Sequence, residues 1–192
     1  MDDSVIKPCF VACCSSMLYY IHGYQSSPQS AKGRLFKQTL QAIPIAYRVG
    51  KPEHLVIKDC LRRIAEVIQN DDNVILIGSS LGGFLAASTA LDHSNVKKLI
   101  LLNPAIIPPT VTLNDDSLPK RILTDMRDKR LFDQRITADI TILRGTEDEV
   151  VPHEWVIQFA LAQEATVIFF HDDHSFTKNL NHLPQIIQRI LR

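Results

Sequence analysis

One stretch, from Asn73 to Ser88, constrains the fold of this chain more than any other. It runs from an apolar segment at 74–77 through Gly-Ser-Ser-Leu-Gly into an Ala- and Leu-rich helical pattern. A Gly-x-Ser-x-Gly sequence in this setting predicts a buried strand, a tight turn and a helix. Because glycines lack the Cβ atoms that would collide in such a turn, we expect Ser80 in a strained backbone conformation with its hydroxyl above the sheet. The alternative is a Gly- and Ser-rich turn without chemistry, and the rest of the chain has to separate the two.

The remaining sequence alternates short apolar runs with helical patterns. Strands are expected at residues 17–21, 45–49, 74–77, 96–102, 139–143 and 165–170. Helices are expected at 30–42 with Ser30 as N-cap, from Pro52 along the apolar face of 57–68, at 82–91, weakly at 120–134, from Pro152, and at 184–191. Such alternation predicts an α/β fold of three layers around a mostly parallel sheet of about six strands.

Length and composition narrow the class of protein. A chain of 192 residues with 45% hydrophobic and 22% charged residues is typical of one globular domain. Lys plus Arg equal Asp plus Glu at 21 each, so no net charge attracts nucleic acid or an anionic membrane. The four cysteines show neither a metal-ligand spacing nor a disulfide framework, and no apolar run approaches the roughly 18 residues that span a bilayer. We therefore expect a cytoplasmic protein with no nucleic-acid partner and no integral membrane segment.

Residues 1–16 differ from the sequence that follows. The run from Phe10 to Cys13 faintly resembles a lipoprotein cleavage site, but Asp2, Asp3 and a short apolar part argue against a signal peptide. We expect an N-terminal extension, either a loose tail or an upstream read-through in which Met17 is the true start. The folded domain is expected to span residues 17–192.

A long interruption between two predicted strands covers residues 106–138. Prolines at 108, 109 and 119 and an Asn-Asp-Asp turn break the rhythm of strands and helices there. A connection of roughly thirty residues is long for this fold class, and long insertions often form lids or binding loops. The two interpretations are a small cap over the site and a peripheral packing helix.

Three residues in separate loops have the chemistry of an activated serine nucleophile. A serine hydroxyl needs a base within hydrogen-bond reach, and the base needs a partner that fixes its tautomer. Ser80, Asp148 and His174 follow predicted strands and occur in the chain order found in α/β-hydrolases. Since ligands bind at the carboxyl ends of parallel strands, we expect the three to meet at one edge of the sheet.

Each of these assignments has an alternative. The acid could instead be Glu147 or Glu149, and the base could be His171, which lies closer to the end of its strand. The histidines and aspartates of 171–174, with His153, could also suggest a metal site. Ligands crowded into one short loop, however, lack the spacing that is typical of metal centres. We therefore expect neither a metal nor a cofactor.

Several runs together resemble a known family. They are Leu-Tyr-Tyr-Ile-His-Gly-Tyr-Gln-Ser-Ser-Pro-Gln-Ser-Ala-Lys from Leu18 to Lys32, Ile77 to Phe84, Asn103 to Ala105, Gly145 to Val150, and His174 to Phe176. On these motifs, which extend from Met17 to the C-terminus, the chain is similar to the α/β-hydrolase superfamily and resembles the small bacterial YqiA-type esterases. The acidic residues of 171–173 depart from the small residues that often precede the histidine in related proteins.

The resemblance implies a function and a set of roles. Ser80 would be the nucleophile, Asp148 the triad acid and His174 the base. The backbone N–H groups of Tyr24 and Leu81 would form the oxyanion hole. The expected reaction is hydrolysis of a small-molecule carboxylic ester or thioester through an acyl-enzyme.

Two other functions remain open on the same fold. One is a catalytically silent α/β-hydrolase-fold protein used for binding, because a fold alone does not prove activity. The other is a C–C bond hydrolase or lyase that uses the same triad. His22, which precedes the predicted oxyanion loop, is expected to brace that loop rather than to react.

Overall fold

A six-stranded sheet forms the middle of the molecule. The computed structural model describes residues 16–111 and 118–192. The strands are β1 (Met17–Ile21), β2 (Ile43–Pro44), β3 (Val74–Ser79), β4 (Val96–Leu102), β5 (Asp139–Gly145) and β6 (Thr166–Phe170). They lie in the order β2-β1-β3-β4-β5-β6, and each neighbouring pair is parallel. The predicted parallel α/β architecture is confirmed.

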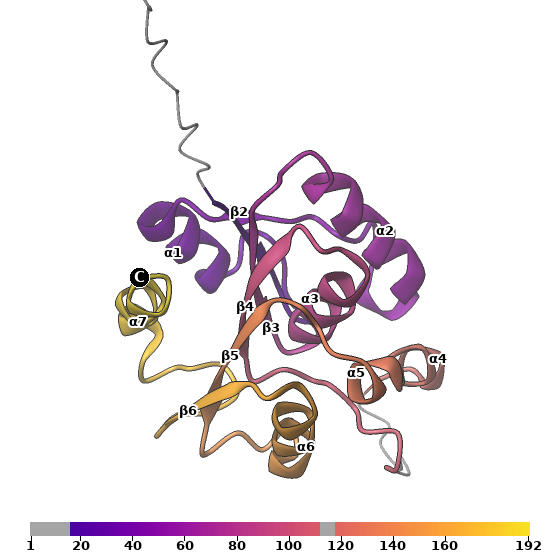
Figure 1. The fold of residues 1–192 in the computed structure, drawn as a ribbon. Coiled ribbons are helices and arrows are strands. Elements are labelled where there is room, and N and C mark those ends of the chain that lie inside the picture. The colour runs from indigo at the N-terminus through magenta and orange to yellow at the C-terminus, as the bar shows by residue number, and fades with distance from the viewer. Residues whose placement is uncertain (1–15, 112–117) are drawn as a thin grey trace, which may run out of the picture.

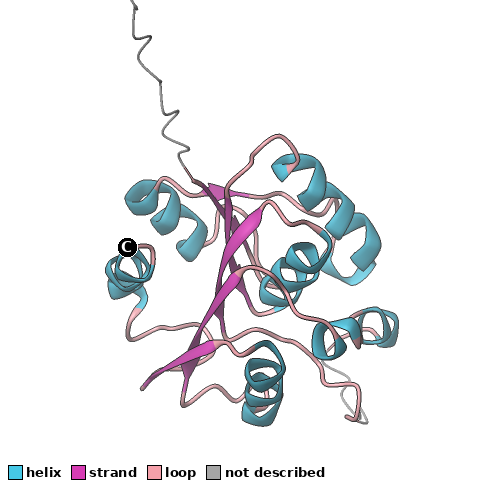
Figure 2. Cartoon of the chain, viewed as in Figure 1, coloured by secondary structure: helices cyan, strands magenta, loops and turns pink. Residues whose placement is uncertain are grey.

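Helices cover both faces of this sheet and complete the three layers. They are α1 (Ala31–Leu40), η1 (Pro52–His54), α2 (Ile57–Ile68), α3 (Leu81–Asp92), α4 (Lys120–Asp125), α5 (Arg130–Asp133), α6 (His153–Gln163), η2 (Leu180–His182) and α7 (Leu183–Ile190). Helices α1 and α7 lie on one face, and α2, α3 and α6 lie on the other, with α4 and α5 beside them (Figure 1). The sheet is seen nearly edge-on between these two layers (Figure 2).

The register of the strands brings their carboxyl ends to one edge. Ile21 at the end of β1 pairs with Gly78 of β3, and Ser79 pairs with Leu102 at the end of β4. Gly145 at the end of β5 pairs with Phe170 at the end of β6. The loops that follow these strands therefore begin side by side, as the sequence predicted.

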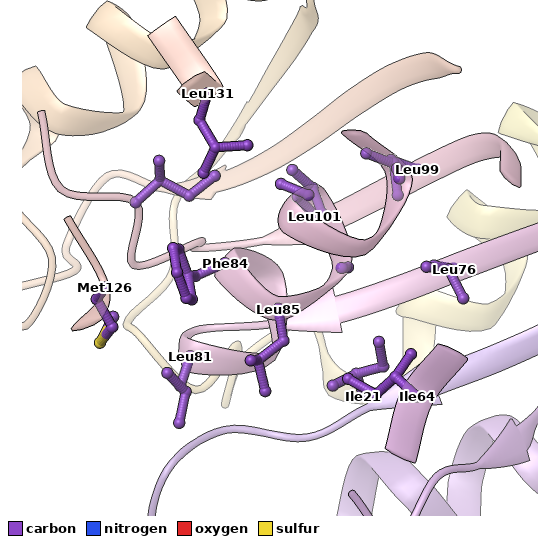
Figure 3. Packing of buried hydrophobic residues seen from close by; sticks show 14 of the residues in the cluster. Ile21, Ile64, Leu76, Leu81, Phe84, Leu85, Leu99, Leu101, Met126 and Leu131 are labelled. Carbon is purple, nitrogen blue, oxygen red and sulfur yellow. The ribbon is translucent and has the colours of Figure 1, made fainter. Parts of the chain in front are cut away.

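Apolar side chains fill the space between the sheet and each helical layer. Helix α3 is buried along almost its whole length, and its Leu81, Phe84 and Leu85 pack among strand residues such as Leu76 and Leu101 (Figure 3). A separate cluster on the opposite face joins β3 and β4 to Phe36 of α1 and Ile187 of α7. Each fully buried side chain of this size contributes roughly 1.5–3 kcal/mol to stability. The helix that starts at the Gly-x-Ser-x-Gly turn is thus fixed by core packing.

The strand expected at 45–49 is wrong. The observed pairing with β1 covers only Ile43–Pro44 and is extended by one bond from the Ile45 N–H to the Tyr20 carbonyl (2.9 Å). Ile45 and Tyr47 are buried in alternation, which explains the strand-like pattern. Beyond Ile45 this segment contacts the loop after β1 through its side chains, so the ladder ends.

Two helix boundaries also differ from the expectation. Pro52 opens the short helix η1 rather than α2, because Leu55 and Val56 have extended backbones and α2 begins only at Ile57. The helix expected at 120–134 is split into α4 and α5. The Asp128 carboxylate accepts the Arg130 N–H (3.1 Å), a bond that starts a new helical turn. The predicted N-cap Ser30 is confirmed, since its hydroxyl accepts the Gly33 N–H at 3.2 Å.

The predicted N-terminal extension lies outside the described residues except for Ser16, and so does part of the predicted cap, residues 112–117.

Cys60 is buried on the core side of α2, where burial raises its thiol pKa to about 11. Within residues 16–111 and 118–192, no helix combines the length and the hydropathy that a membrane crossing requires.

Candidate active site

Ser80 occupies the sharp turn between β3 and α3. Its backbone angles are φ 54° and ψ −120°, a conformation that is rare for a residue with a side chain. The turn is held on both sides, because the Ser80 N–H donates to the Leu102 carbonyl (3.0 Å) and the Ser80 carbonyl accepts the Gly83 and Ala105 N–H groups (2.8 and 3.1 Å). The strained serine that the motif predicted is therefore present.

Glycines allow other chain segments to approach this turn. A Cβ atom on Gly82 would lie 2.1 Å from the carbonyl oxygen of Ile21, and one on Gly78 would lie 2.4 Å from the carbonyl oxygen of Gly82. A Cβ atom on Gly23 would lie 3.4 Å from that of Ser80, so the loop after β1 lies directly against the serine. The backbone of this loop and the turn at Ser80 thus form one wall.

The loop after β1 is braced by the residues that follow β2. The His22 ring stacks on Tyr47, with ring centroids 4.4 Å apart, and its Nδ1 lies 2.8 Å from the Gly23 carbonyl oxygen. The Tyr47 hydroxyl donates to the carbonyls of His22 and Gly23 (3.2 Å each). The Arg48 guanidinium donates to the carbonyl of Tyr24 and, at 2.6 Å, to that of Ser26. Burial lowers the pKa of His22 to about 4, so its environment is that of a neutral bracing group.

Asp148 and His174 meet across the loops after β5 and β6. The His174 Nδ1 lies 2.9 Å from the Asp148 Oδ2, and the Asp148 side chain is completely buried. Burial alone would raise the pKa of this carboxyl. Hydrogen bonds from His174 and from the N–H groups of Val151 and Val150 outweigh burial and hold the pKa below its ordinary range. Asp148 is thus a buried carboxylate that fixes the orientation of the His174 ring.

Arg144, at the end of β5, gives Asp148 a buried counterion that sequence reasoning missed. Its side chain is 2% exposed, and its Nη1 lies 2.5 Å from the Asp148 Oδ2. Its Nη2 donates to the Val151 carbonyl at 2.7 Å. A buried arginine was not deducible from Leu-Arg-Gly in a strand, because the sequence does not show which partner will neutralise it.

Asn103 joins three loops, a role that the sequence motif Asn-Pro-Ala did not indicate. It is completely buried with φ 43°, a left-handed conformation that asparagine tolerates. Its Oδ1 accepts the Gly145 N–H (2.8 Å), and its Nδ2 donates to the carbonyls of Asp173 and His174 (3.2 and 3.1 Å). Asn103 therefore ties the turn after β4 to the segments that carry Asp148 and His174.

The acidic residues before His174 hold its loop in shape. Asp172 is completely buried, and its carboxylate accepts the N–H groups of Asp173, Lys178 and Asn179 at 2.8–3.0 Å. The Asp173 Oδ1 accepts the N–H groups of Ser175 and Thr177 (2.9 and 3.0 Å). Asp172 and Asp173, which stand where related proteins often have small residues, therefore stabilise the conformation of the His174 loop.

The alternatives for acid and base have other surroundings. The His171 side chain is 79% exposed and lies 3.4 Å from Glu147, which also contacts Lys178. His153 packs at a tilt on Phe169. Within the described parts of the chain, no three His, Cys, Asp or Glu side chains converge as metal ligands would. The structure thus brings His174, rather than His171, to Asp148.

A cavity of about 800 Å³ opens at this edge of the sheet. Of the predicted site residues, Ser80, Leu81, Tyr24 and His174 line it, and Asp148 lies behind His174. Residues of the predicted cap insertion also contribute to the wall, among them Ile107, Val111, Leu118, Leu123 and Met126.

The sheet order, the strained serine between β3 and α3, and the helices on both faces are those of the α/β-hydrolase fold, and the chain is a member of that superfamily. More narrowly, it belongs to the uncharacterised protein family UPF0227, the YqiA-like family, whose family model matches residues 17–190. The predicted resemblance is confirmed.

Solved structures of other proteins have the same fold. Est1E from Butyrivibrio proteoclasticus, solved with ferulic acid bound, superposes with a TM-score of 0.74 at 16% identity, over 92% of this chain and 88% of Est1E. Monoacylglycerol lipase from Paleococcus ferrophilus gives 0.72 at 15% identity, over 91% and 93% of the two chains. Mouse alpha/beta hydrolase domain-containing protein 10 gives 0.71 at 19% identity, over 91% and 88%. At these identities the likeness establishes the fold.

Proposed function

We propose that the protein is a serine hydrolase that cleaves carboxylic esters or thioesters. The observation that carries the proposal is the bond between His174 Nδ1 and Asp148 Oδ2, with His174 and the strained Ser80 lining the same cavity. An imidazole held through Nδ1 by a carboxylate has its Nε2 available as a base, which is the arrangement that activates a serine.

The proposed reaction has two steps. Ser80 Oγ attacks the acyl carbonyl while His174 takes its proton, the alcohol or thiol leaves with that proton, and an acyl-enzyme forms. His174 then takes a proton from water, whose oxygen attacks the acyl carbon. The bond from the acyl carbon to Ser80 Oγ breaks, Ser80 Oγ takes the proton from His174, and the acid is released. The N–H groups of Tyr24 and Leu81 would stabilise the oxyanion, and loss of one such donor typically costs roughly 10²- to 10³-fold in rate. The bond from the Tyr47 hydroxyl to the Gly23 carbonyl fits this role, because this carbonyl and the Tyr24 N–H belong to the same peptide unit.

A fluorophosphonate probe and a serine substitution test the proposal. The probe should label Ser80 in the folded protein, and Ser80→Ala should abolish labelling and lower ester turnover by about 10³-fold or more. Ser88→Ala is the matched control, because Ser88 is a buried serine of α3 outside the cavity. This variant should keep both the probe labelling of Ser80 and the ester turnover. A folded wild-type protein without a Ser80 adduct would overturn the proposal and favour a binding protein. An active Ser80→Ala variant would overturn the assignment of Ser80 as the nucleophile.

A further inference from the structure

The cavity beside Ser80 has two chemically different sides. One side, toward α4 and α6, is lined by apolar residues that include Ile107, Leu123, Met126 and Trp155. The other side, toward α1 and the segment before α7, is lined mostly by polar residues, Ser26, Ser30, Lys32, Ser175 and Thr177, with Ala31 and Leu180 beside them. Helices α1 and α7 lie on one face of the sheet and α4 and α6 on the other, so the cavity crosses the carboxyl edge of the sheet (Figure 1). Ser80 follows β3, near the centre of this edge, between the apolar and the polar sides.

Lys32 brings a positive charge to the polar side of the cavity. Among the described residues that line the cavity, Lys32 is the single Lys or Arg, and none is Asp or Glu. The ion pairs within the described parts of the chain do not include Lys32. Its side chain is half-buried, and burial lowers the pKa of its amine, an effect that Asp173 and Asp172 partly offset.

The two nearby carboxylates, Asp172 and Asp173, form no ion pair with Lys32. Asp172 and Asp173 accept backbone N–H groups of the His174 loop, and neither lies within 4.0 Å of the Lys32 ammonium. Lys32 also gains nothing from its place in α1, because a cation in the first turn opposes the helix dipole. Helix stability therefore does not account for a lysine here, whereas an anion in the cavity would pair with it.

We propose that Lys32 selects ester or thioester substrates that carry an anionic group, a carboxylate or a phosphate, on one side of the scissile bond and an apolar group on the other. This inference rests on the proposed hydrolase function and narrows its substrate class. The apolar group occupies the side of Leu123 and Trp155. The anion binds the Lys32 ammonium, with the hydroxyls of Ser30 and Thr177 as further donors.

Matched pairs of esters test this selection. Mono-4-nitrophenyl glutarate against 4-nitrophenyl pentanoate places the anion on the acyl side. The 4-hexanoyloxybenzoate anion against its methyl ester places it on the leaving-group side, and hexanoyl esters of 4-hydroxyphenyl phosphate extend the second pair to phosphate. Lys32→Met should lower the anionic-to-neutral ratio of kcat/KM by about ten- to a hundredfold in at least one pair, the size expected for a hydrogen bond to a charged group. Lys32→Glu should lower it further.

Lys37→Met is the matched control, because Lys37 is an exposed lysine of the same helix and should leave every ratio unchanged. The pair that responds identifies the side of the bond that carries the anion. Unchanged ratios in both Lys32 variants, with Ser80-dependent hydrolysis of the neutral esters intact, would overturn the inference and leave the hydrolase proposal standing.

A binding measurement makes the test independent of turnover. Trp155 is the single tryptophan of the chain and lines the cavity, so its fluorescence reports occupancy. In Ser80→Ala protein, monohexyl glutarate should bind at least about tenfold more tightly than hexyl methyl glutarate, and Lys32→Met should remove this difference. Equal affinities for the two compounds would overturn the inference even if no ester were hydrolysed.

Discussion

The loops around the cavity are built in two different ways. After β1 and β3 the geometry is held by close backbone approach, with glycines at 23, 78 and 82 and a buried helix behind them. After β4, β5 and β6 it is held by buried polar side chains, chiefly Asn103, Arg144, Asp148 and Asp172. We call the loops after β1 and β3 the backbone wall and the loops after β4, β5 and β6 the polar wall. Substitutions in the two walls should affect stability and activity differently.

Arg144→Met gives the largest expected effect and tests the polar wall. It leaves the fully buried Asp148 carboxylate without its counterion, which typically costs about 3–5 kcal/mol in the free energy of unfolding. Urea unfolding measures this loss. Adding Asp148→Asn to Arg144→Met should recover part of the stability, because the double variant no longer buries an uncompensated charge.

Arg135→Met is the control for this prediction. The Arg135 and Glu164 side chains are 51% and 80% exposed, so the loss of their ion pair should cost less than about 1 kcal/mol. Equal losses in the two arginine variants would show that the polar wall depends on packing rather than on charge.

The pH dependence of stability gives the second effect and concerns the single histidine that braces the backbone wall. Because the folded pKa of His22 is about 4 and the unfolded value is about 6.5, the unfolded chain takes up the proton first. The stability contributed by neutral His22 is therefore full above pH 6.5 or so and is lost as the pH falls toward about 4. The expected loss is on the order of 3 kcal/mol.

The comparison with His22→Phe isolates this loss, since other titrating groups are common to both proteins. The difference in free energy of unfolding between wild type and variant, measured by urea at a series of pH values, should shift against the wild type between pH 7 and 4. A difference that stays constant with pH would contradict a buried neutral His22.

Tyr47→Phe gives the smallest effect and sharpens the comparison within the backbone wall. It removes the hydroxyl that donates to the carbonyls of His22 and Gly23, and the expected cost is about 1 kcal/mol with a several-fold fall in ester kcat/KM. Tyr19→Phe is a matched control, because the Tyr19 hydroxyl bonds Asp71 away from the cavity and its loss should leave kcat/KM unchanged. An unaltered kcat/KM in Tyr47→Phe would mean that the loop is braced without the Tyr47 hydroxyl, by His22 and Arg48.

The sequence predicted the backbone wall better than the polar wall. The parallel sheet, the strained Ser80 and the end of β4 at Leu102 followed from apolar periodicity and a glycine motif, because both are local patterns. The role of Arg144 and Asn103 could not be predicted, since it depends on residues that are distant in sequence and meet only in the fold.

The wrong strand at 45–49 has a related cause. Alternating burial of Ile45 and Tyr47 is the local signature of a strand, but pairing needs a partner of sufficient length, and β1 ends at Ile21. The Tyr47 and Arg48 side chains contact the carbonyls of the loop beyond it instead. The alternation of apolar residues indicated that one side of this segment is buried. It did not indicate which groups the buried side chains contact.

The arginine beside the acid has a consequence for the charge inside the site. The charges of Arg144 and Asp148 cancel, so together with a neutral His174, the form that acts as a base in the proposed reaction, they carry no net charge before reaction. In the proposed first step His174 gains the Ser80 proton and the three side chains together become +1, at the moment when the oxyanion becomes −1. The two charges arise together and sum to zero, so the transition state would create a dipole across the cavity without adding net charge to the protein interior.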